Sequence, residues 1–174
     1  SDVSCDPEPP MGSILYLTEA PKTGGDTLFA SMYRAYETLS PALRKVLDRL
    51  EAEHHFENAL SNFSTFKATD RQIDATPPVR HPMVTVHPDT GRKSLYVNPG
   101  FTTRIVGMNA DESEAILRFL FSHATQPQFI YQHRWQAHDL VIWDNRCTQH
   151  FALNDYHGHR RVMHRVTVAG GRPA

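Results

Sequence analysis

Short apolar runs separated by turn residues recur along the chain, and this pattern constrains the fold more than any other feature. The candidate strands span residues 13–17, 27–30, 81–87, 94–97, 129–135, 139–142 and 161–168. Asp89-Thr90-Gly91 separates two of them and is typical of a hairpin turn. Because most neighbouring runs are joined by turns and do not alternate with helices, the pattern favours an antiparallel sandwich or open barrel with helices packed outside. We therefore expect a mainly β fold with flanking helices.

Helical patterns lie between some of these strands. Residues 32–39 have apolar side chains at helical spacing. Ser40 followed by Pro41 is typical of an N-cap and a first helical position, and the apolar positions after it predict a helix that runs to about Glu53. A further helix is predicted over about 111–124, where apolar residues share one face, with Asn109 or Asp111 as its N-cap.

The composition is that of an ordinary globular protein. The 174 residues suit one domain, with 40% apolar and 21% charged residues. A net charge of -1 lacks the basic footprint of nucleic-acid binding. No apolar run approaches the roughly 18 residues that a membrane span needs, and the start has no signal-peptide pattern. Cys5 and Cys147 are too few for a disulfide framework, so we expect reduced thiols in a cytoplasmic protein.

Residues 57–80 are polar and have no clear period. A loop of this length in a compact domain is often a lid or a binding loop, and the alternative is simple disorder. The chain also opens inside a loop-like segment without an initiator Met. We therefore expect a piece of a longer protein.

The stretch from Trp143 to His150 follows residues 139–142, which are predicted to form a buried strand, and leads by a polar turn toward the predicted strand 161–168. His150 is a candidate metal ligand, or else an ordinary core or surface histidine, because one histidine makes no metal site. His157 and His159 lie in a Gly-containing turn that we expect to be exposed. Cys147 forms a Cys-x-x-His pair with His150, but no second such pair exists, so a structural zinc site is poorly supported.

Arg161 and Arg165 lie on one face of the predicted strand 161–168, with Cα atoms roughly 13 Å apart. Arginine suits bidentate recognition of carboxylate or sulfonate groups, so the two residues are candidates for binding two anions. The alternative is a solvated face with surface salt bridges. The opposite face is mostly apolar and predicts a core contact, with His164 as a buried, hydrogen-bonded histidine.

Four stretches together carry a family resemblance. They are Ser1-Asp2-Val3-Ser4 with Pro9-Pro10 and Gly12-Ser13, then Gly24-Gly25-Asp26-Thr27, then Val97-Asn98 through Ile105, and finally Trp143-Asp144-Asn145-Arg146 through His150 to His164-Arg165. In this order they resemble the taurine dioxygenase family of Fe(II)- and 2-oxoglutarate-dependent oxygenases. The resemblance implies a double-stranded β-helix, or jelly roll, incomplete at its N-terminus. It also implies that residues 1–174 form a single catalytic domain, the C-terminal portion of a longer dioxygenase domain.

The resemblance implies roles for particular residues. Asp2 and His150 match the metal-binding carboxylate and the distal histidine of the family, whose remaining histidine would stand directly before Ser1. A two-histidine, one-carboxylate site leaves iron positions open for 2-oxoglutarate and O2. Thr27 and Arg161 match the pair that binds the distal carboxylate of 2-oxoglutarate.

Substrate contacts are implied in the same way. Arg165 matches the arginine that binds the anionic group of the substrate. Val3 is expected to offer its backbone N–H to that anion, and Trp143 is expected to form a wall near the iron.

The activity so implied is hydroxylation of a small anionic organic substrate, a sulfonate such as taurine or an alkyl sulfate, with release of succinate and CO2. The alternative is a catalytically inert jelly-roll binding module, should the histidine before Ser1 be absent. A third alternative, a zinc hydrolase, is poorly supported because the sequence offers no plausible general base beside the metal. Since family members are often dimers or tetramers, a homo-oligomer is expected, with no nucleic acid or membrane as partner.

Overall fold

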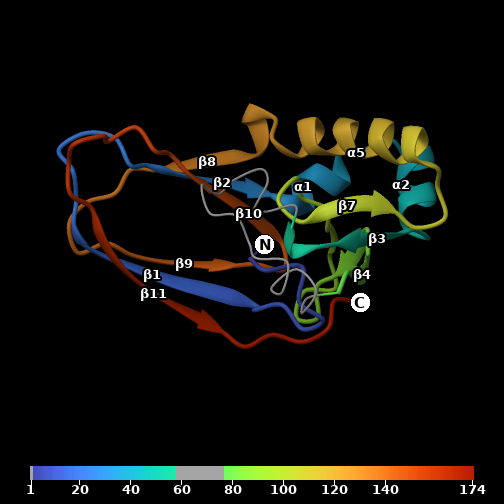
Figure 1. Cartoon of the computed structure of the whole chain (residues 1–174), viewed down its shortest axis with the longest axis horizontal. Helices are drawn as coiled ribbons and strands as arrows, with labels where there is room; N and C mark the ends of the chain where they lie inside the picture. Colours follow the sequence, from blue (N-terminus) through green and yellow to red (C-terminus); the bar gives the residue numbers. More distant parts are fainter. Residues whose placement is uncertain (1, 58–76) are drawn as a thin grey trace.

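Two three-stranded antiparallel sheets face one another and form one half of the molecule (Figure 1). The computed structural model describes residues 2–57 and 77–174. The first sheet has the order β11 (Val162–Val168), β1 (Gly12–Glu19), β9 (Leu140–Asp144). The second has the order β10 (Thr148–Ala152), β2 (Thr27–Ser31), β8 (Ile130–His133). This arrangement confirms the expected mainly β fold.

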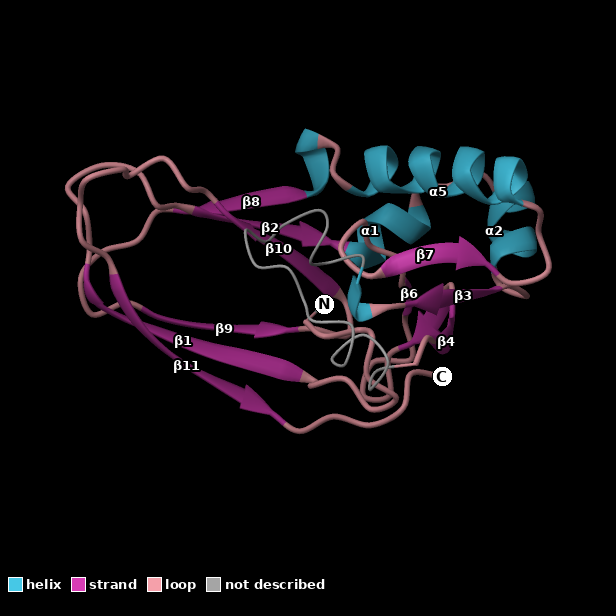
Figure 2. Cartoon of the chain, in the orientation of Figure 1, coloured by secondary structure: helices cyan, strands magenta, loops and turns pink. Residues whose placement is uncertain are grey.

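The helices gather at the other end of the molecule beside two smaller sheets (Figure 2). The helices with described bounds are α1 (Met32–Glu37), α2 (Pro41–Leu47), α5 (Ala110–Ala124) and the short 3-10 helix η1 (Pro127–Phe129). The smaller sheets are β4 (Val79–Pro82), β3 (Glu51–His54), β7 (Thr102–Ile105) and the hairpin of β5 (Val84–Val86) with β6 (Lys93–Leu95). Within the described ranges, no helix is long and apolar enough to cross a membrane.

The helix starts follow the capping residues of the sequence. The Asn109 side chain accepts a 2.9 Å hydrogen bond from the backbone N–H of Glu112, and Glu112 accepts from the Asn109 N–H at 3.1 Å. This reciprocal capping box satisfies two otherwise unpaired donors at the start of α5. The Ser40 hydroxyl accepts from the Leu43 N–H, with Pro41 in the first turn of α2. Both predicted starts are confirmed.

The prediction of a helix that runs to Glu53 is wrong. Helix α2 ends at Leu47, and Glu51–His54 forms strand β3 between β4 and β7. Ala52 and His54 are fully buried there. The backbone of this segment finds its hydrogen bonds in two neighbouring strands that are distant in sequence, and this tertiary pairing overrides a local helical pattern.

The predicted strand 81–87 is two strands, β4 and β5, separated at Met83. Met83 is fully buried, and its N–H donates to the Leu50 carbonyl at 2.9 Å. Of the loop predicted over 57–80, residues 79 and 80 belong to β4, and residues 58–76 lie outside the described part. The predicted hairpin about Asp89-Thr90-Gly91 is confirmed by the pairing of β5 with β6.

The main hydrophobic core lies between the helices and the smaller sheets. Its fully buried side chains include Leu47, Met83, Leu95, Ile105 and Leu120. The two large sheets instead enclose a separate layer that contains Leu17, Phe29 and Trp143. This second layer leaves room for polar groups and holds the candidate site.

The outward face of the sheet β11-β1-β9 is exposed, contrary to two predictions. Leu140 and Ile142 are 59% and 65% exposed, although residues 139–142 were predicted to form a buried strand. His164 is also exposed, so its prediction as a buried histidine is wrong. Ile14 pairs with both Ile142 and Val166, and side chains directly opposite in an antiparallel pair share one face. The apolar alternation was therefore real, but it marks the face turned away from the second sheet.

Candidate active site between the two large sheets

Strand register decides which side chains face the space between the sheets. In the second sheet His150 pairs with Phe29 and Ala152 pairs with Thr27, so His150 and Thr27 point to the same side. Aromatic contacts close the layer, because the Trp143 ring lies 4.8 Å from that of His150 and 5.6 Å from that of Phe29. Trp143 thus packs directly beside His150.

Asp2 and His150 meet although 148 positions separate them in the sequence. Asp2 Oδ1 lies 3.5 Å from His150 Nε2, and Asp2 is only 9% exposed. Burial lowers the pKa of His150 to about 4, against the opposing effect of the Asp2 charge. The imidazole is therefore neutral at physiological pH, which is the form that binds a metal ion. A carboxylate and a neutral imidazole with facing ligand atoms fit two positions of a 2-histidine, 1-carboxylate iron site.

The second carboxylate oxygen of Asp2 already has two donors. Ser13 Oγ donates to Asp2 Oδ2 at 2.7 Å, and Arg165 Nη2 donates to the same oxygen. The Arg165 guanidinium also lies 5.5 Å from the Trp143 ring. The expected substrate arginine is thus beside the candidate metal ligands and stacked on the expected wall residue.

Thr27 and Arg161 meet through a third residue, Trp135. Trp135 Nε1 donates to Thr27 Oγ1 at 2.9 Å, and the Arg161 guanidinium lies 5.9 Å from the Trp135 ring and 5.5 Å from the Tyr156 ring. Arg161 Nε and Nη2 are buried, and among the described residues neither atom has a hydrogen-bond partner. Unpaired buried donors on a charged group are costly, so this guanidinium is suited to a carboxylate that would pair with both.

The glycine turn beside Arg161 explains how the guanidinium is accommodated. Gly25 has a φ of +76°, and a Cβ built there would lie 3.2 Å from the Tyr156 ring and 3.3 Å from Arg161. Its N–H donates to Asp155 Oδ1 at 2.6 Å. A larger residue would therefore strain the backbone and crowd the Arg161 side chain.

Val3 follows Asp2 and has a φ of +49°, which is unusual for a β-branched residue. It is 40% exposed, and its carbonyl accepts a hydrogen bond from the Asp6 N–H at 2.9 Å. Strained conformations of this kind cluster at functional sites. His157 and His159, in contrast, lie exposed in their turn as predicted.

The family described as "Taurine catabolism dioxygenase TauD, TfdA family" matches residues 1–167. The chain belongs to this family. Among curated relatives, it is 37% identical over 169 residues to an alkylsulfatase of Acinetobacter baylyi, covering 92% of this chain and 53% of that protein. It is 35% identical over 176 residues to an alpha-ketoglutarate-dependent sulfonate dioxygenase of Saccharomyces cerevisiae, covering 99% of this chain and 42% of that protein.

Solved structures of the family share the fold. A crystal structure of AAD-2 in complex with Mn(II) and N-oxalylglycine matches with a TM-score of 0.92 and 38% identity, over 99% of this chain and 68% of that one. A taurine dioxygenase from Burkholderia xenovorans matches with a TM-score of 0.86 and 37% identity, over 99% and 58%. These likenesses confirm the jelly roll. The chain spans about half the length of the curated relatives it matches.

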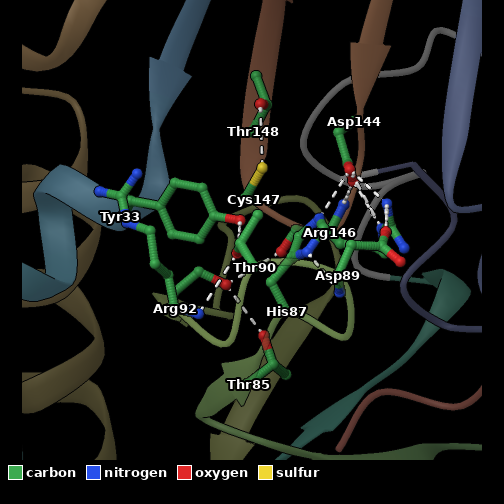
Figure 3. Close-up of polar contacts among 11 residues, drawn as sticks. Tyr33, Thr85, His87, Asp89, Thr90, Arg92, Asp144, Arg146, Cys147 and Thr148 are labelled. Carbon is green, nitrogen blue, oxygen red and sulfur yellow. Dashed lines mark hydrogen bonds and ion pairs between the residues drawn. The ribbon is translucent and has the colours of Figure 1, made fainter.

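A second cluster of side chains that could bind a metal ion lies beside the turn between β9 and β10. His87, Asp144 and Cys147 hold their ligand atoms within 4.8 Å of one another. Asp144 accepts from His87 Nε2 at 2.9 Å and from Arg146 Nη2 at 2.7 Å, as Figure 3 shows. The His87 Nδ1 accepts from the Asp89 N–H, so the Nε2 atom carries the proton.

These contacts explain the cluster as an anchor for the turn. Burial acts to raise the pKa of Asp144, but the hydrogen bonds from Arg146 and His87 outweigh it and lower that pKa. Burial also raises the pKa of the Cys147 thiol, which keeps it protonated. The turn that separates Trp143 from His150 is thereby fixed to the β5–β6 hairpin. Cys147 is no partner of His150 in a zinc site.

The segment that carries Asp2 is fixed by residues to which sequence reasoning gave no role. Ser4 Oγ accepts from Asn98 Nδ2 at 2.9 Å and lies 3.0 Å from His54 Nδ1. His81 Nε2 donates to the Asp6 carbonyl at 3.0 Å. Asn98 lies in one of the four family stretches, and that position was the available signal for it.

Three further residues near the site were also missed. They are Ser13, Asn145 and Trp135, which contact Asp2, Trp143 and Thr27 directly or through one another. Ser13 and Asn145 also stand within the family stretches. Trp135 carried no signal beyond its place at the end of a predicted strand.

A cavity of about 590 Å³ adjoins Asp2 and His150. Its lining is mostly apolar and includes Leu28, Phe101, Ile130 and Phe151. Within the part of the chain that the structure describes, Asp2 and His150 are its only ionisable lining residues.

Proposed function

We propose that this chain forms the C-terminal portion of an Fe(II)- and 2-oxoglutarate-dependent dioxygenase domain. The protein would hydroxylate a small anionic organic substrate, consume O2, and release succinate and CO2. The observation that carries the proposal is the facing pair of Asp2 Oδ1 and His150 Nε2, 3.5 Å apart, in a chain of the taurine dioxygenase family. Fe(II), when bound, would supply the centre at which 2-oxoglutarate and O2 react.

Asp2 and His150 would hold the metal together with a histidine outside this chain. Both side chains are ready for this role, because His150 is neutral and Asp2 is held by hydrogen bonds at its other oxygen. Thr27 and Arg161 would bind the distal carboxylate of 2-oxoglutarate. Two buried donor atoms of Arg161 have no partner in the part of the chain that the structure describes, and this supports the assignment.

The spacing between His150 and Thr27 also supports the binding of one 2-oxoglutarate molecule to both the metal and Thr27. His150 pairs with Phe29 on the neighbouring strand, and Thr27 is two residues from Phe29. Two residues correspond to about 7 Å along the strand. A molecule the size of 2-oxoglutarate can therefore reach from the metal ligands to Thr27 and Arg161.

Arg165 would bind the anionic group of the substrate, with Val3 offering its backbone N–H and Trp143 forming the wall. The curated relatives include an alkylsulfatase, an alpha-ketoglutarate-dependent sulfate ester dioxygenase from Pseudomonas putida and sulfonate dioxygenases. Among the described residues the lining of the adjoining cavity is mostly apolar and has Asp2 as its only carboxylate. This supports a sulfate or sulfonate with an alkyl body over taurine, whose ammonium group would need an acidic partner.

A cytoplasmic location and a homo-oligomer, dimer or tetramer, are further parts of the proposal. They rest on composition and family resemblance. The inert binding module is not favoured, because the curated relatives are named as dioxygenases and an alkylsulfatase.

The test is succinate formation from 2-oxoglutarate with a panel of taurine, alkyl sulfates and aryloxyacetates. The purified protein is assayed with Fe(II) and O2, and Asp2→Ala is the matched inactive variant. We expect O2-dependent succinate formation stimulated by at least one anion of the panel, with an alkyl sulfate exceeding taurine. Succinate formation equal to that of Asp2→Ala with every substrate would exclude the proposed activity.

A further inference from the structure

The orientation of the Asp2 carboxylate is set by a directional chain of hydrogen bonds that begins at Trp143. Trp143 Nε1 donates to Asn145 Oδ1 at 2.9 Å, and Asn145 Nδ2 donates to Ser13 Oγ at 3.3 Å. Ser13 Oγ then donates to Asp2 Oδ2 at 2.7 Å. This series of hydrogen bonds links three elements. They are the segment before β1, strand β1 itself, and the end of β9 with the turn that follows it.

The donor and acceptor roles follow from the chemistry of the groups. An indole N–H only donates, so the Asn145 atom that faces Trp143 is its oxygen, and the amide nitrogen faces Ser13. The Ser13 hydroxyl oxygen therefore receives an N–H from Asn145, and it receives another from Arg165 Nη2 at 3.1 Å. Its single hydrogen is left for Asp2, which as a carboxylate only accepts.

Burial makes this series of hydrogen bonds rigid. Ser13 is fully buried, Asn145 is 2% exposed and Trp143 is 7% exposed, so water does not compete for these hydrogen bonds. The Asn145 backbone is fixed as well, because its N–H donates to the Met11 carbonyl at 2.9 Å.

We propose that Ser13 and Asn145 are positioning residues that turn Asp2 Oδ1 toward His150 and hold the carboxylate ready for one-oxygen binding of the metal. This inference rests on the proposed function. Ser13 and Arg165 both donate to Asp2 Oδ2, and Oδ1 is the oxygen that faces His150 Nε2. Hydrogen bonds that orient a metal ligand typically contribute 10- to 100-fold to metal affinity.

The test is Mn²⁺ affinity, measured by calorimetry on the purified protein under 2-oxoglutarate-free conditions. Ser13→Ala removes one of the two donors to Asp2 Oδ2 and leaves only Arg165 Nη2, and we expect Mn²⁺ binding weakened about 10- to 100-fold. Ser13→Thr keeps the hydroxyl and should restore the affinity to within a few-fold. Ser94→Ala is the matched control, since Ser94 is also fully buried and hydrogen bonds Thr85 and the Arg146 carbonyl outside the site.

Asn145→Asp is a second variant of nearly equal size, which guards against a folding defect in Ser13→Ala. Its carboxylate still accepts from Trp143, but it cannot donate to Ser13 and competes with Asp2 for the Ser13 hydrogen. We expect weaker Mn²⁺ binding without loss of the folded state in circular dichroism.

Two negative results are distinguishable. If Asp2→Ala weakens Mn²⁺ binding while Ser13→Ala and Asn145→Asp both match Ser94→Ala, the positioning role is wrong and the metal site stands. If Asp2→Ala leaves Mn²⁺ binding unchanged, the metal site is wrong and the positioning role falls with it.

Discussion

Trp135 donates a 2.9 Å hydrogen bond from Nε1 to Thr27 Oγ1 and at the same time faces the guanidinium of Arg161. The indole thus fixes the hydroxyl of Thr27 and contacts the guanidinium of Arg161 with its ring. Thr27 and Arg161 stand 134 positions apart, so the contact exists only in the folded chain. It brings a hydroxyl and an arginine together, and within residues 2–57 and 77–174 Arg161 Nε and Nη2 have no hydrogen-bond partner.

Arg161→Gln should weaken 2-oxoglutarate binding roughly 10- to 100-fold, because a charge-assisted hydrogen-bond pair contributes about 1.5–3 kcal/mol. The measurement is 2-oxoglutarate affinity by calorimetry with Mn²⁺ bound. Arg160→Gln is the matched control, since the neighbouring Arg160 is 76% exposed and pairs with Glu19. Equal losses in the two variants would show that the effect is one of general charge.

His150→Gln should abolish measurable Mn²⁺ binding or weaken it at least 100-fold, because the metal loses an imidazole ligand and keeps a poorer amide. His159→Gln removes an exposed histidine from the nearby turn and should leave the affinity unchanged. Unaltered binding by His150→Gln would place the metal elsewhere. The two variants are compared in the same calorimetric titration.

Stability should fall when the pH drops below about 6.5. Burial lowers the pKa of His54 to about 3, with the neighbouring His81 charge acting in the same direction. In the unfolded chain the pKa returns to about 6.5, so between these values the unfolded state binds more protons than the folded state. As the pH falls, this histidine lowers the free energy of unfolding by up to about 1.4 kcal/mol per pH unit. Above pH 6.5 its contribution to stability is fully retained.

Urea unfolding at pH 7 and pH 5 measures this slope. His54→Asn removes one of the histidines whose pKa burial lowers, the others being His81 and His150, and should make the slope less steep whatever its effect on stability at pH 7. His157→Gln, at an exposed turn position, should keep the slope of the parent protein. A slope that His54→Asn leaves intact would assign the acid sensitivity to other groups.

Asp144→Ala should destabilise the protein by about 1–3 kcal/mol, because it leaves the buried His87 Nε2–H without its acceptor. Thermal unfolding measures the loss. Asp89→Ala is the matched control, because Asp89 is the other carboxylate on Arg146 but is 71% exposed. We expect Asp89→Ala to change stability by less than about 1 kcal/mol. A loss for Asp89→Ala as large as for Asp144→Ala would contradict the anchoring role of the β9–β10 turn.

Much of the candidate site was predicted from residue types in order along the chain. The resemblance selected Asp2, His150, Thr27, Arg161, Arg165 and Trp143, and the structure brings these into two neighbouring groups between the sheets. It left out Ser13, Asn145 and Trp135. These residues act through single hydrogen bonds to other side chains, and such contacts have no periodicity or spacing in sequence.

The errors in the fold have a similar cause. The helical pattern after Pro41 extends past Leu47, but β3 gains two neighbouring strands from distant segments. The alternation of Leu140 and Ile142 is correct as a strand, but period two does not say which face is buried. His164 shares the outward face with Val166 for the same reason.

The sequence by itself determined the local structure whose causes lie within a few residues: the caps at Ser40 and Asn109, the hairpin at Asp89-Thr90-Gly91, and the alternation of the strands. It also determined the family, through four ordered stretches. Only the tertiary structure decided which sheet face is enclosed and how the Asp2 carboxylate is oriented. Those outcomes depend on hydrogen bonds and burial between segments more than 100 residues apart, which local sequence patterns do not encode.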